Sequence, residues 1–181
     1  MNFLKSNKTS KFVTFLAAIL LIGCTPKFNW REVRGTDAPF VVVMPAKPET
    51  YARPIRLGDV QVTMTMTASE VDGMTFAVGT ATLPDASKAV ASIHLMKSAL
   101  VNNISGTIRK ERVSGSTQHQ VTSIDLEIVG ASTASSSGQP RLMVARLIAK
   151  DNKVYQALVV GLEKSVTPEA LDTFFTSLNL N

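Results

Sequence analysis

The only cysteine of this 181-residue chain lies near its start, directly after a stretch of apolar side chains. Three lysines precede that stretch, which runs from Phe12 to Ile22, and Gly23 separates it from Cys24. A basic start, a short apolar run and a small residue before the cleavage point are typical of a secretory signal peptide. The run is well short of the ~20 residues that a membrane-spanning helix needs. We therefore expect residues 1–23 to be a signal peptide and not a permanent transmembrane anchor.

The segment Leu21-Ile22-Gly23-Cys24 resembles a bacterial lipobox, in which the cysteine thiol receives a diacylglyceryl group and becomes the first residue of the mature protein. The resemblance implies a bacterial lipoprotein with its lipidation site at Cys24. Two acyl chains suffice for stable anchoring, whereas a single chain binds membranes only marginally. Thr25, rather than Asp, follows the cysteine. By the same resemblance this implies delivery to the outer membrane, where the protein faces the periplasm.

The charge of the chain argues against a nucleic-acid partner. The signal segment carries three lysines and no acidic residue, so the net charge of +5 falls to about +2 without it. The densest basic cluster, residues 109–112, contains Glu111 and no aromatic residue, and we interpret it as the solvated face of a strand. With Cys24 acylated, no thiol remains for a disulfide, and the fold must depend on packing.

Residues 24–38 are predicted to form a lipidated tether that precedes a single domain over residues 39–181. The aromatic residues Phe28 and Trp30 leave two interpretations of this segment open. Residues 29–34 could pair as an edge strand, because Trp30 has too much apolar surface to be left in water. Alternatively, the segment is a membrane-proximal linker whose tryptophan sits at the lipid interface.

Alternation of apolar and polar residues predicts several strands in the domain. Val and Met alternate with Gln and Thr over residues 60–68, and the alternation resumes over residues 74–78. Asp72-Gly73 lies between these segments and suits the positive φ angles of a type I′ turn, which predicts a hairpin. Further strands are expected over Phe40–Met44, 107–113, 120–129, 141–150 and 153–162, the last two joined at Asp151-Asn152.

Apolar residues at helical spacing predict two helices. The first carries a stripe of Val90, Ile93, Leu95/Met96, Leu100 and Ile104, with Asp85 or Ser87 placed to cap its start. The second begins at Thr167-Pro168 and carries Leu171, Phe174, Phe175 and Leu178. Strands joined by tight hairpins, with helices in two places, predict an α+β fold in which a mostly antiparallel β-sheet packs with two helices.

The run Phe40-Val-Val-Val-Met-Pro-Ala-Lys-Pro48 resembles the opening motif of the Mog1/PsbP-like proteins. Residues 141–161 and the segment Phe174-Phe175-x-Ser177-Leu178 are similar to the closing strands and helix of that family. The resemblance covers most of residues 38–181, and it departs from the family at Met44 and in a serine-rich loop over residues 131–140. It implies an antiparallel sheet between helices, used elsewhere for binding and assembly, and it brings no catalytic residues with it.

Residues suited to catalysis are few and scattered. Neither His94 nor His119 has carboxylates at metal-ligand spacing, so we expect no metal. Asp125 and Glu127 alternate on the polar face of one predicted strand, where solvated charges belong. The chain contains neither a nucleophile-elbow serine nor a phosphate-binding or dinucleotide-binding motif. We expect no cofactor and no enzyme activity; a hydrolase would need Asp125, Glu127 or His119 to converge in a cleft.

These observations leave two alternative non-enzymatic functions. We favour an outer-membrane-anchored, periplasm-facing lipoprotein that acts as a binding or assembly module for a protein or envelope component. The alternative is a carrier of a small apolar ligand, with a pocket between the sheet and the helix over residues 90–104. Met64, Met66 and Phe76 are the predicted lining of that pocket, because methionines form adaptable apolar surfaces. Their period-two spacing is, however, more typical of a filled core.

Overall fold

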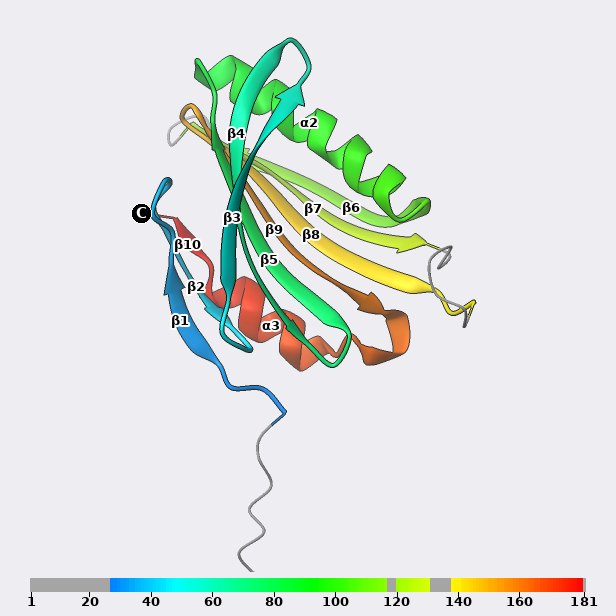
Figure 1. Ribbon diagram of the computed structural model, residues 1–181. Helices are drawn as coiled ribbons and strands as arrows, with labels where there is room; N and C mark the ends of the chain where they lie inside the picture. The colour runs from blue at the N-terminus through cyan, green and yellow to red at the C-terminus, as the bar shows by residue number, and fades with distance from the viewer. Residues whose placement is uncertain (1–26, 117–119, 131–137, 181) are drawn as a thin grey trace, which may run out of the picture.

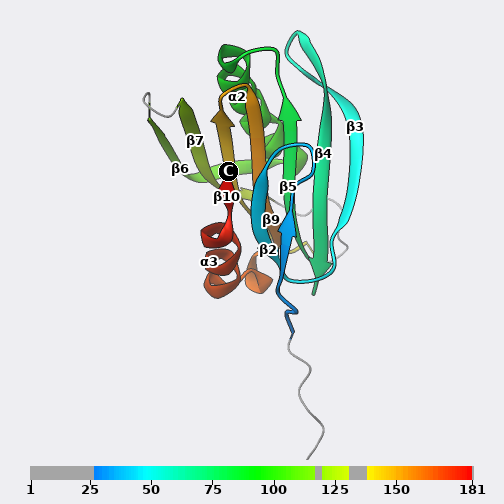
Figure 2. The same cartoon turned by 90° about the vertical axis from the view of Figure 1, so that its left-hand side faces the viewer.

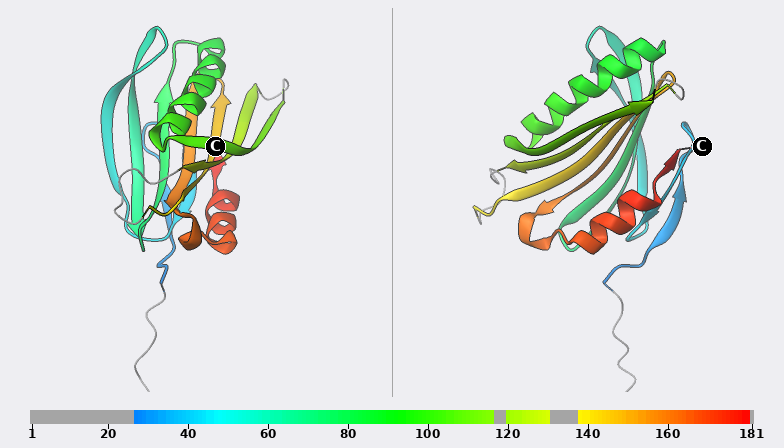
Figure 3. Two further views of the ribbon diagram at one scale, coloured as in Figure 1. Left: turned by 90° about the vertical axis from the view of Figure 1, so that its right-hand side faces the viewer. Right: turned by 180° about the vertical axis from the view of Figure 1, so that it is seen from behind.

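The structure, a computed structural model, describes residues 27–116, 120–130 and 138–180 (Figure 1). These residues form three layers: helix α2 (Ala86–Asn103), a seven-stranded sheet, and a layer that combines helix α3 (Pro168–Ser177) with a three-stranded sheet. Figure 3 shows α2 on one face of the large sheet and α3 on the other. The predicted α+β fold, with a mostly antiparallel sheet and two helices, is confirmed for the described residues.

Every strand pairing within the described residues is antiparallel. In spatial order, the large sheet contains β3 (Glu49–Leu57), β4 (Val60–Val71), β5 (Met74–Thr82), β9 (Lys153–Leu162), β8 (Arg141–Lys150), β7 (Val121–Gly130) and β6 (Gly106–Ser116). The small sheet contains β1 (Arg31–Arg34), β2 (Phe40–Met44) and β10 (Asn179–Leu180), with β2 in the middle. A 3₁₀ turn, η2 (Glu163–Ser165), links β9 to α3.

The turns between neighbouring strands follow the local sequence. Asp72 and Gly73 have φ angles of +50° and +71°, and Val71 pairs directly with Met74, as the predicted tight hairpin requires. The second predicted hairpin, at Asp151-Asn152, joins β8 and β9. Strand β3 was not predicted, because most of its side chains are exposed and it lacks apolar alternation.

Helix α2 begins as predicted but buries a shifted stripe. The Asp85 side chain caps its start, where Oδ1 accepts a hydrogen bond from the backbone N–H of Lys88 at 2.8 Å. Val90 and Leu95, expected in the apolar stripe, are 37% and 45% exposed. The residues that α2 buries against the sheet are Ala89, Ser92, Ile93, Met96 and Leu100. Small side chains at positions 89 and 92 bring the helix close to the sheet.

The segment from Lys27 onward is folded onto the domain. Strand β1 pairs with β2, and the backbone N–H of Asn29 donates to the Pro45 carbonyl at 2.8 Å. Phe28 and Trp30 both pack edge-on against Phe76, with ring centroids 6.5 and 5.9 Å away. Of the two interpretations of this segment, the structure supports the edge strand, and the described part of the predicted tether belongs to the folded domain.

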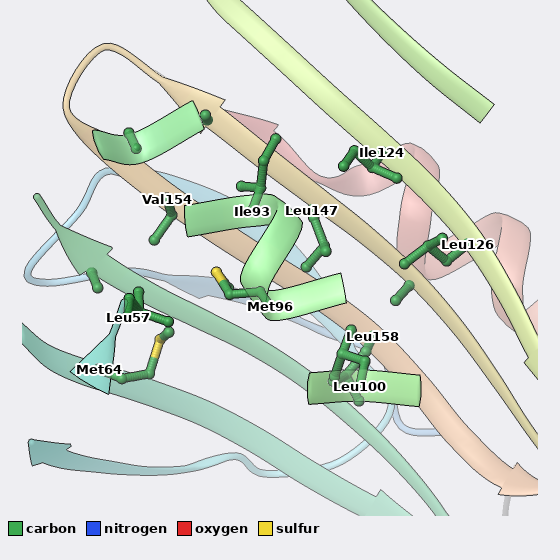
Figure 4. Close-up of a cluster of buried hydrophobic side chains, with 14 of the residues drawn as sticks. Leu57, Met64, Ile93, Met96, Leu100, Ile124, Leu126, Leu147, Val154 and Leu158 are labelled. Atoms are coloured by element: carbon green, nitrogen blue, oxygen red, sulfur yellow. The ribbon is translucent and has the colours of Figure 1, made fainter. Parts of the chain in front are cut away.

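The large sheet separates two apolar cores. The α2-side core is built from aliphatic and methionine side chains, and Figure 4 shows its centre, where Ile93, Met96 and Leu100 of α2 meet the sheet. The α3-side core holds Phe40, Phe76, Tyr155 and Phe174 beneath the small sheet and α3. Helix α3 begins as predicted, with the Thr167 side chain accepting from the Ala170 N–H and Pro168 in its first turn.

Three expectations concern residues outside the described ranges: the signal segment with Cys24, His119, and most of the serine-rich loop. Within the described residues, no helix is both long enough and apolar enough to cross a membrane.

Candidate binding groove

The three residues predicted to line one apolar pocket lie on opposite faces of the sheet. Met64 and Met66 face α2 and belong to the α2-side core, whereas Phe76 is fully buried in the α3-side core. The register explains the separation, because Met66 pairs with Gly79 while Phe76 pairs with Ser69, and neighbouring positions of a strand point to opposite faces. The structure therefore does not bring the three side chains together.

The carboxylates considered for catalysis are each held by a cation. Asp125 Oδ1 lies 2.6 Å from Nε of Arg146. Glu127 pairs with Arg109 and Lys110, both at 3.1 Å. His94 is exposed on α2, whereas both carboxylates alternate with Ile124, Leu126 and Ile128 of the α2-side core and so lie on the other face of the sheet. Within the described ranges, no group of three or more His, Cys, Asp or Glu side chains could hold a metal ion.

Arg109 lies at a β-bulge of the edge strand β6, where the register with β7 shifts between Ile108 and Lys110. Its guanidinium bridges Glu127 and Glu163, with the Glu163 oxygen 2.6 Å away. Hydrogen bonds to Glu163 and then to Glu127 raise the pKa of Arg109 above its usual range, and the group keeps its charge. A bulge that carries paired charges is a common device for blocking further pairing at a sheet edge.

The α3 layer is narrower than the sheet beneath it, and it leaves part of β6–β8 uncovered (Figure 2). Two adjoining hollows of about 450 and 480 Å³ lie along this boundary and share Asp125 and Arg146. We name them together the α3 groove. Its lining comes from β6–β8, α3 and β10: Ser114, Val121, Ser123, Asp125, Val144, Ala145, Arg146, Ile148, Lys150, Pro168, Leu171, Asp172, Phe175 and Leu180.

One end of the α3 groove is apolar. Val144 of β8 faces Leu171 and Phe175 of α3 across it. The Phe175 ring packs edge-on against Phe174, with centroids 5.1 Å apart, and this contact fixes its position. The Arg146 guanidinium lies 5.6 Å from the Phe175 ring centroid, within range of a cation–π interaction.

The other end combines the apolar side chains of Val121, Ile148 and Leu180 with polar groups. The hydroxyls of Ser114 and Ser123 are hydrogen-bonded across β6 and β7 at 2.8 Å. Lys150 Nζ donates to the Leu180 carbonyl at 3.0 Å and thereby ties β8 to the short strand β10. This end offers hydroxyls and an ammonium group to a bound molecule.

The Asp125–Arg146 pair separates the two ends. Each side chain is about one-third exposed, so the pair is fixed in place yet accessible from the groove. Ion pairs at such exposure contribute little to stability, typically about 0–1 kcal/mol. Their value here is orientation, because one fixed anion and one fixed cation can select the polar groups of a ligand. The arrangement is suited to holding a molecule by contacts and hydrogen bonds.

One residue in the sequence, Arg146, indicated this groove, but the sequence pattern alone did not identify its partner. Arg146 lies in the middle of β8, between the buried residues Ala145 and Leu147. A charge within an otherwise buried strand must meet a partner or an opening in the structure. Arg146 meets both, but the partner, Asp125, comes from a different strand and only tertiary structure shows the pairing.

A further hollow of about 770 Å³ lies between the start of α2 and the facing ends of β6 and β7. Val90, Gly115 and Thr122 are among its lining residues. A comparison with protein-family models finds no match to this chain, and a comparison with curated proteins finds no similar sequence.

Proposed function

We propose that this protein is an outer-membrane lipoprotein, anchored through Cys24 and facing the periplasm, that acts as a non-enzymatic binding module for a protein or envelope component. The α3 groove is the observation that carries the binding part of the proposal. The lipobox-like segment at residues 21–24 carries the anchoring part. The Mog1/PsbP-like assignment of the domain is part of the same proposal, and the antiparallel sheet with helices on both faces agrees with it.

The lining of the α3 groove favours a segment of polypeptide as its occupant. Apolar side chains of a partner would contact Leu171 and Phe175, while its polar groups would reach Ser123 and Lys150 at the other end. Charges of both signs line the groove, so it suits an amphipathic chain better than a strongly acidic or basic one. The volume of each hollow falls within the ~300–1,000 Å³ of typical ligand sites.

Photocrosslinking in intact cells tests the binding role. A benzophenone amino acid at Asp172, an exposed residue of the groove, should give a crosslinked product of discrete mass. The same probe at Tyr51, which is 52% exposed on the opposite edge strand β3, should not give that product. Products that are identical at the two positions would show that the groove is not the contact surface.

A charge variant sharpens this experiment. Arg146→Ala removes the central cation of the groove, and we expect the Asp172 product to fall at least about tenfold, equivalent to ~1.4 kcal/mol. Arg141→Ala, at the start of the same strand, is the matched control and should leave the product unchanged. Melting temperatures of both variants establish that each is folded.

The anchoring part is tested separately. Cys24→Ser should abolish acylation and leave an unprocessed precursor, because the thiol is the lipid acceptor of the motif. Intact-mass analysis of the wild-type protein should show a diacylglyceryl adduct on the N-terminal cysteine. Absence of that adduct would remove the localisation together with the anchor.

The second candidate function is a carrier of a small apolar ligand, and the hollow beside α2 favours it. Val90 is exposed there although it is apolar, and a ligand could cover it. Native mass spectrometry of protein purified without detergent should then show a bound small molecule. Val90→Trp should displace it by filling the hollow, whereas Leu95→Trp, farther along the helix, should not.

A further inference from the structure

The described part of the chain begins at Lys27, three residues after the proposed lipid site. Lys27 Nζ is paired with Asp72 Oδ2 at 3.0 Å, next to the β4–β5 turn. Phe28 and Trp30 are then fixed by their contacts with Phe76. The chain is thus held by an ion pair, a backbone hydrogen bond and aromatic packing from Lys27 onward.

Only Thr25 and Pro26 separate Lys27 from Cys24. A fully extended chain covers at most about 3.3–3.6 Å per residue, so the Cα atoms of Cys24 and Lys27 can be no more than roughly 11 Å apart. That distance is smaller than the diameter of a folded domain of this size, which has a radius of gyration of about 15 Å. A lipid on Cys24 therefore keeps the Lys27 end of the domain close to the bilayer surface, because the connection is too short to separate the two.

We propose that the end of the domain bearing Lys27 lies directly against the lipid headgroups, with the opposite end directed into the periplasm. This rests on the proposed lipidation of Cys24. Figure 1 shows that the β2–β3 connection and the β4–β5 turn lie at the same end as Lys27. The β3–β4 turn and the start of α2 lie at the opposite end.

The side chains at the Lys27 end are compatible with a headgroup layer. Lys27 lies 5.3 Å from the ring centroid of Phe28, so a cation and an aromatic ring meet where the chain enters the domain. Such a pair suits the membrane interface, because its apolar part can approach the lipid while its charge stays in water. Lys27 is neutralised by Asp72. We therefore attribute the contact to the tether and expect it to be independent of anionic lipid.

This orientation also restricts the partner of the α3 groove. Helix α3 lies in the half of the domain nearer to Lys27, as Figures 1 and 2 show. The apolar end of the groove, at Leu171 and Phe175, is then nearer to the membrane, and its other end lies toward the start of α2, where Val121 also borders the hollow beside that helix. A polypeptide held in the groove then extends from near the bilayer surface toward the periplasm, as a periplasmic segment of a membrane protein does.

Site-specific quenching in vesicles tests the orientation. Mature protein acylated at Cys24 is reconstituted in phosphatidylcholine vesicles that contain a headgroup-linked quencher, with a fluorophore on Lys47→Cys or on Gln61→Cys. Lys47 lies in the β2–β3 connection and Gln61 near the β3–β4 turn, and both are exposed. Acylation of Cys24 leaves the introduced thiol as the only one available for labelling. We expect at least threefold stronger quenching at position 47, unchanged when anionic phosphatidylglycerol is added.

A tether variant supplies the control. A Gly-Ser insert of about twenty residues between Pro26 and Lys27 has a root-mean-square length of roughly 25 Å, and it should lower quenching at position 47 to the level at position 61. Equal quenching at the two positions of protein whose lipid is verified by mass would overturn the orientation and leave the lipoprotein assignment standing. Missing lipid on Cys24 would overturn both.

Discussion

The two faces of the large sheet are packed with different kinds of side chain. The α2-side core contains aliphatic residues and methionines, and none of its described members is aromatic. The α3-side core contains the aromatic residues Phe28, Trp30, Phe40, Phe76, Tyr155, Phe174 and Phe175. One continuous helix covers the first face, whereas short elements from both ends of the chain cover the second. Because aromatic side chains are large, even these short elements bury enough apolar surface to pack stably on the sheet.

The layers packed on the two faces also differ in which strands of the sheet they cover. Helix α2 packs against β6, β7, β8 and β9. On the other face α3 and the small sheet leave part of β6–β8 open, and the α3 groove forms at that boundary. The layer of α3 and the small sheet thus provides the groove proposed for a polypeptide, whereas the hollow beside α2 is the second candidate site. The following predictions test this contrast, beginning with the largest expected effect.

The α3-side core should depend on Phe174. This side chain is fully buried, and its ring meets both Phe76 and Phe175 edge-on. Phe174→Ala should lower the free energy of unfolding by about 3–5 kcal/mol, a large share of the ~5–15 kcal/mol that stabilises a typical domain. Urea denaturation of the domain without its lipid measures the change.

Substitutions at the two adjacent residues of α3 serve as controls for Phe174→Ala. Thr173→Ala should cost far less, because this side chain is only partly buried and its hydroxyl bonds to the Glu169 carbonyl of its own helix. Phe175→Ala should fall between the two, since Phe175 is partly exposed in the groove. A loss below about 1 kcal/mol for Phe174→Ala would mean that α3 contributes little to the core.

Added methyl groups should distinguish a rigid face from an adaptable one. A Cβ at Gly35 would contact the Phe40 ring and the Ala38 carbonyl, which belong to the α3 side and cannot easily move. A Cβ at Gly79 would contact the sulfur of Met66 on the α2 side, which is the flexible part of its side chain. Gly35→Ala should therefore cost about 1–3 kcal/mol, and Gly79→Ala clearly less. The reverse order in thermal unfolding would contradict the contrast.

The β4–β5 turn joins two strands that contribute to both cores. A substitution in this turn changes backbone strain and leaves the packing of either core unaltered. Gly73 has a φ of +71°, and a Cβ there would have no neighbour within 4 Å. Gly73→Val should cost about 1–2 kcal/mol because a β-branched residue is disfavoured in the left-handed region. Gly73→Asn, which tolerates that region, is the control. Equal melting temperatures for the two variants would show that the turn relaxes into another conformation.

Local signals in the sequence predicted much of this fold. The Asp72-Gly73 and Asp151-Asn152 turns, and the caps at Asp85 and Thr167, were identifiable because each depends on a few adjacent residues. The alternation that predicted β4 also predicted which of its residues share a face. The α+β fold class followed from these elements.

Features that depend on distant segments were not predictable in the same way. Strand β3 lacks apolar alternation because it is an edge strand with mostly exposed side chains. The separation of Met66 from Phe76 depends on the register between β4 and β5. The α3 groove depends on Asp125 meeting Arg146, and on the width of the α3 layer relative to the sheet.

The smallest predicted effect concerns the start of α2. Hydrogen bonds from the Ser87 hydroxyl and the Lys88 backbone N–H hold the pKa of Asp85 below its ordinary value. A carboxylate whose pKa is lower in the folded state stabilises the protein above its unfolded pKa of about 4. That contribution is lost as the pH falls through the lower, folded pKa.

Asp85→Ala should thus be less stable than wild type at pH 7, and the difference in unfolding free energy should shrink below pH ~4. Denaturation at a series of pH values measures it, with the exposed Asp172→Ala as control. A difference that does not change with pH would show that the ionised carboxylate is not what stabilises the cap.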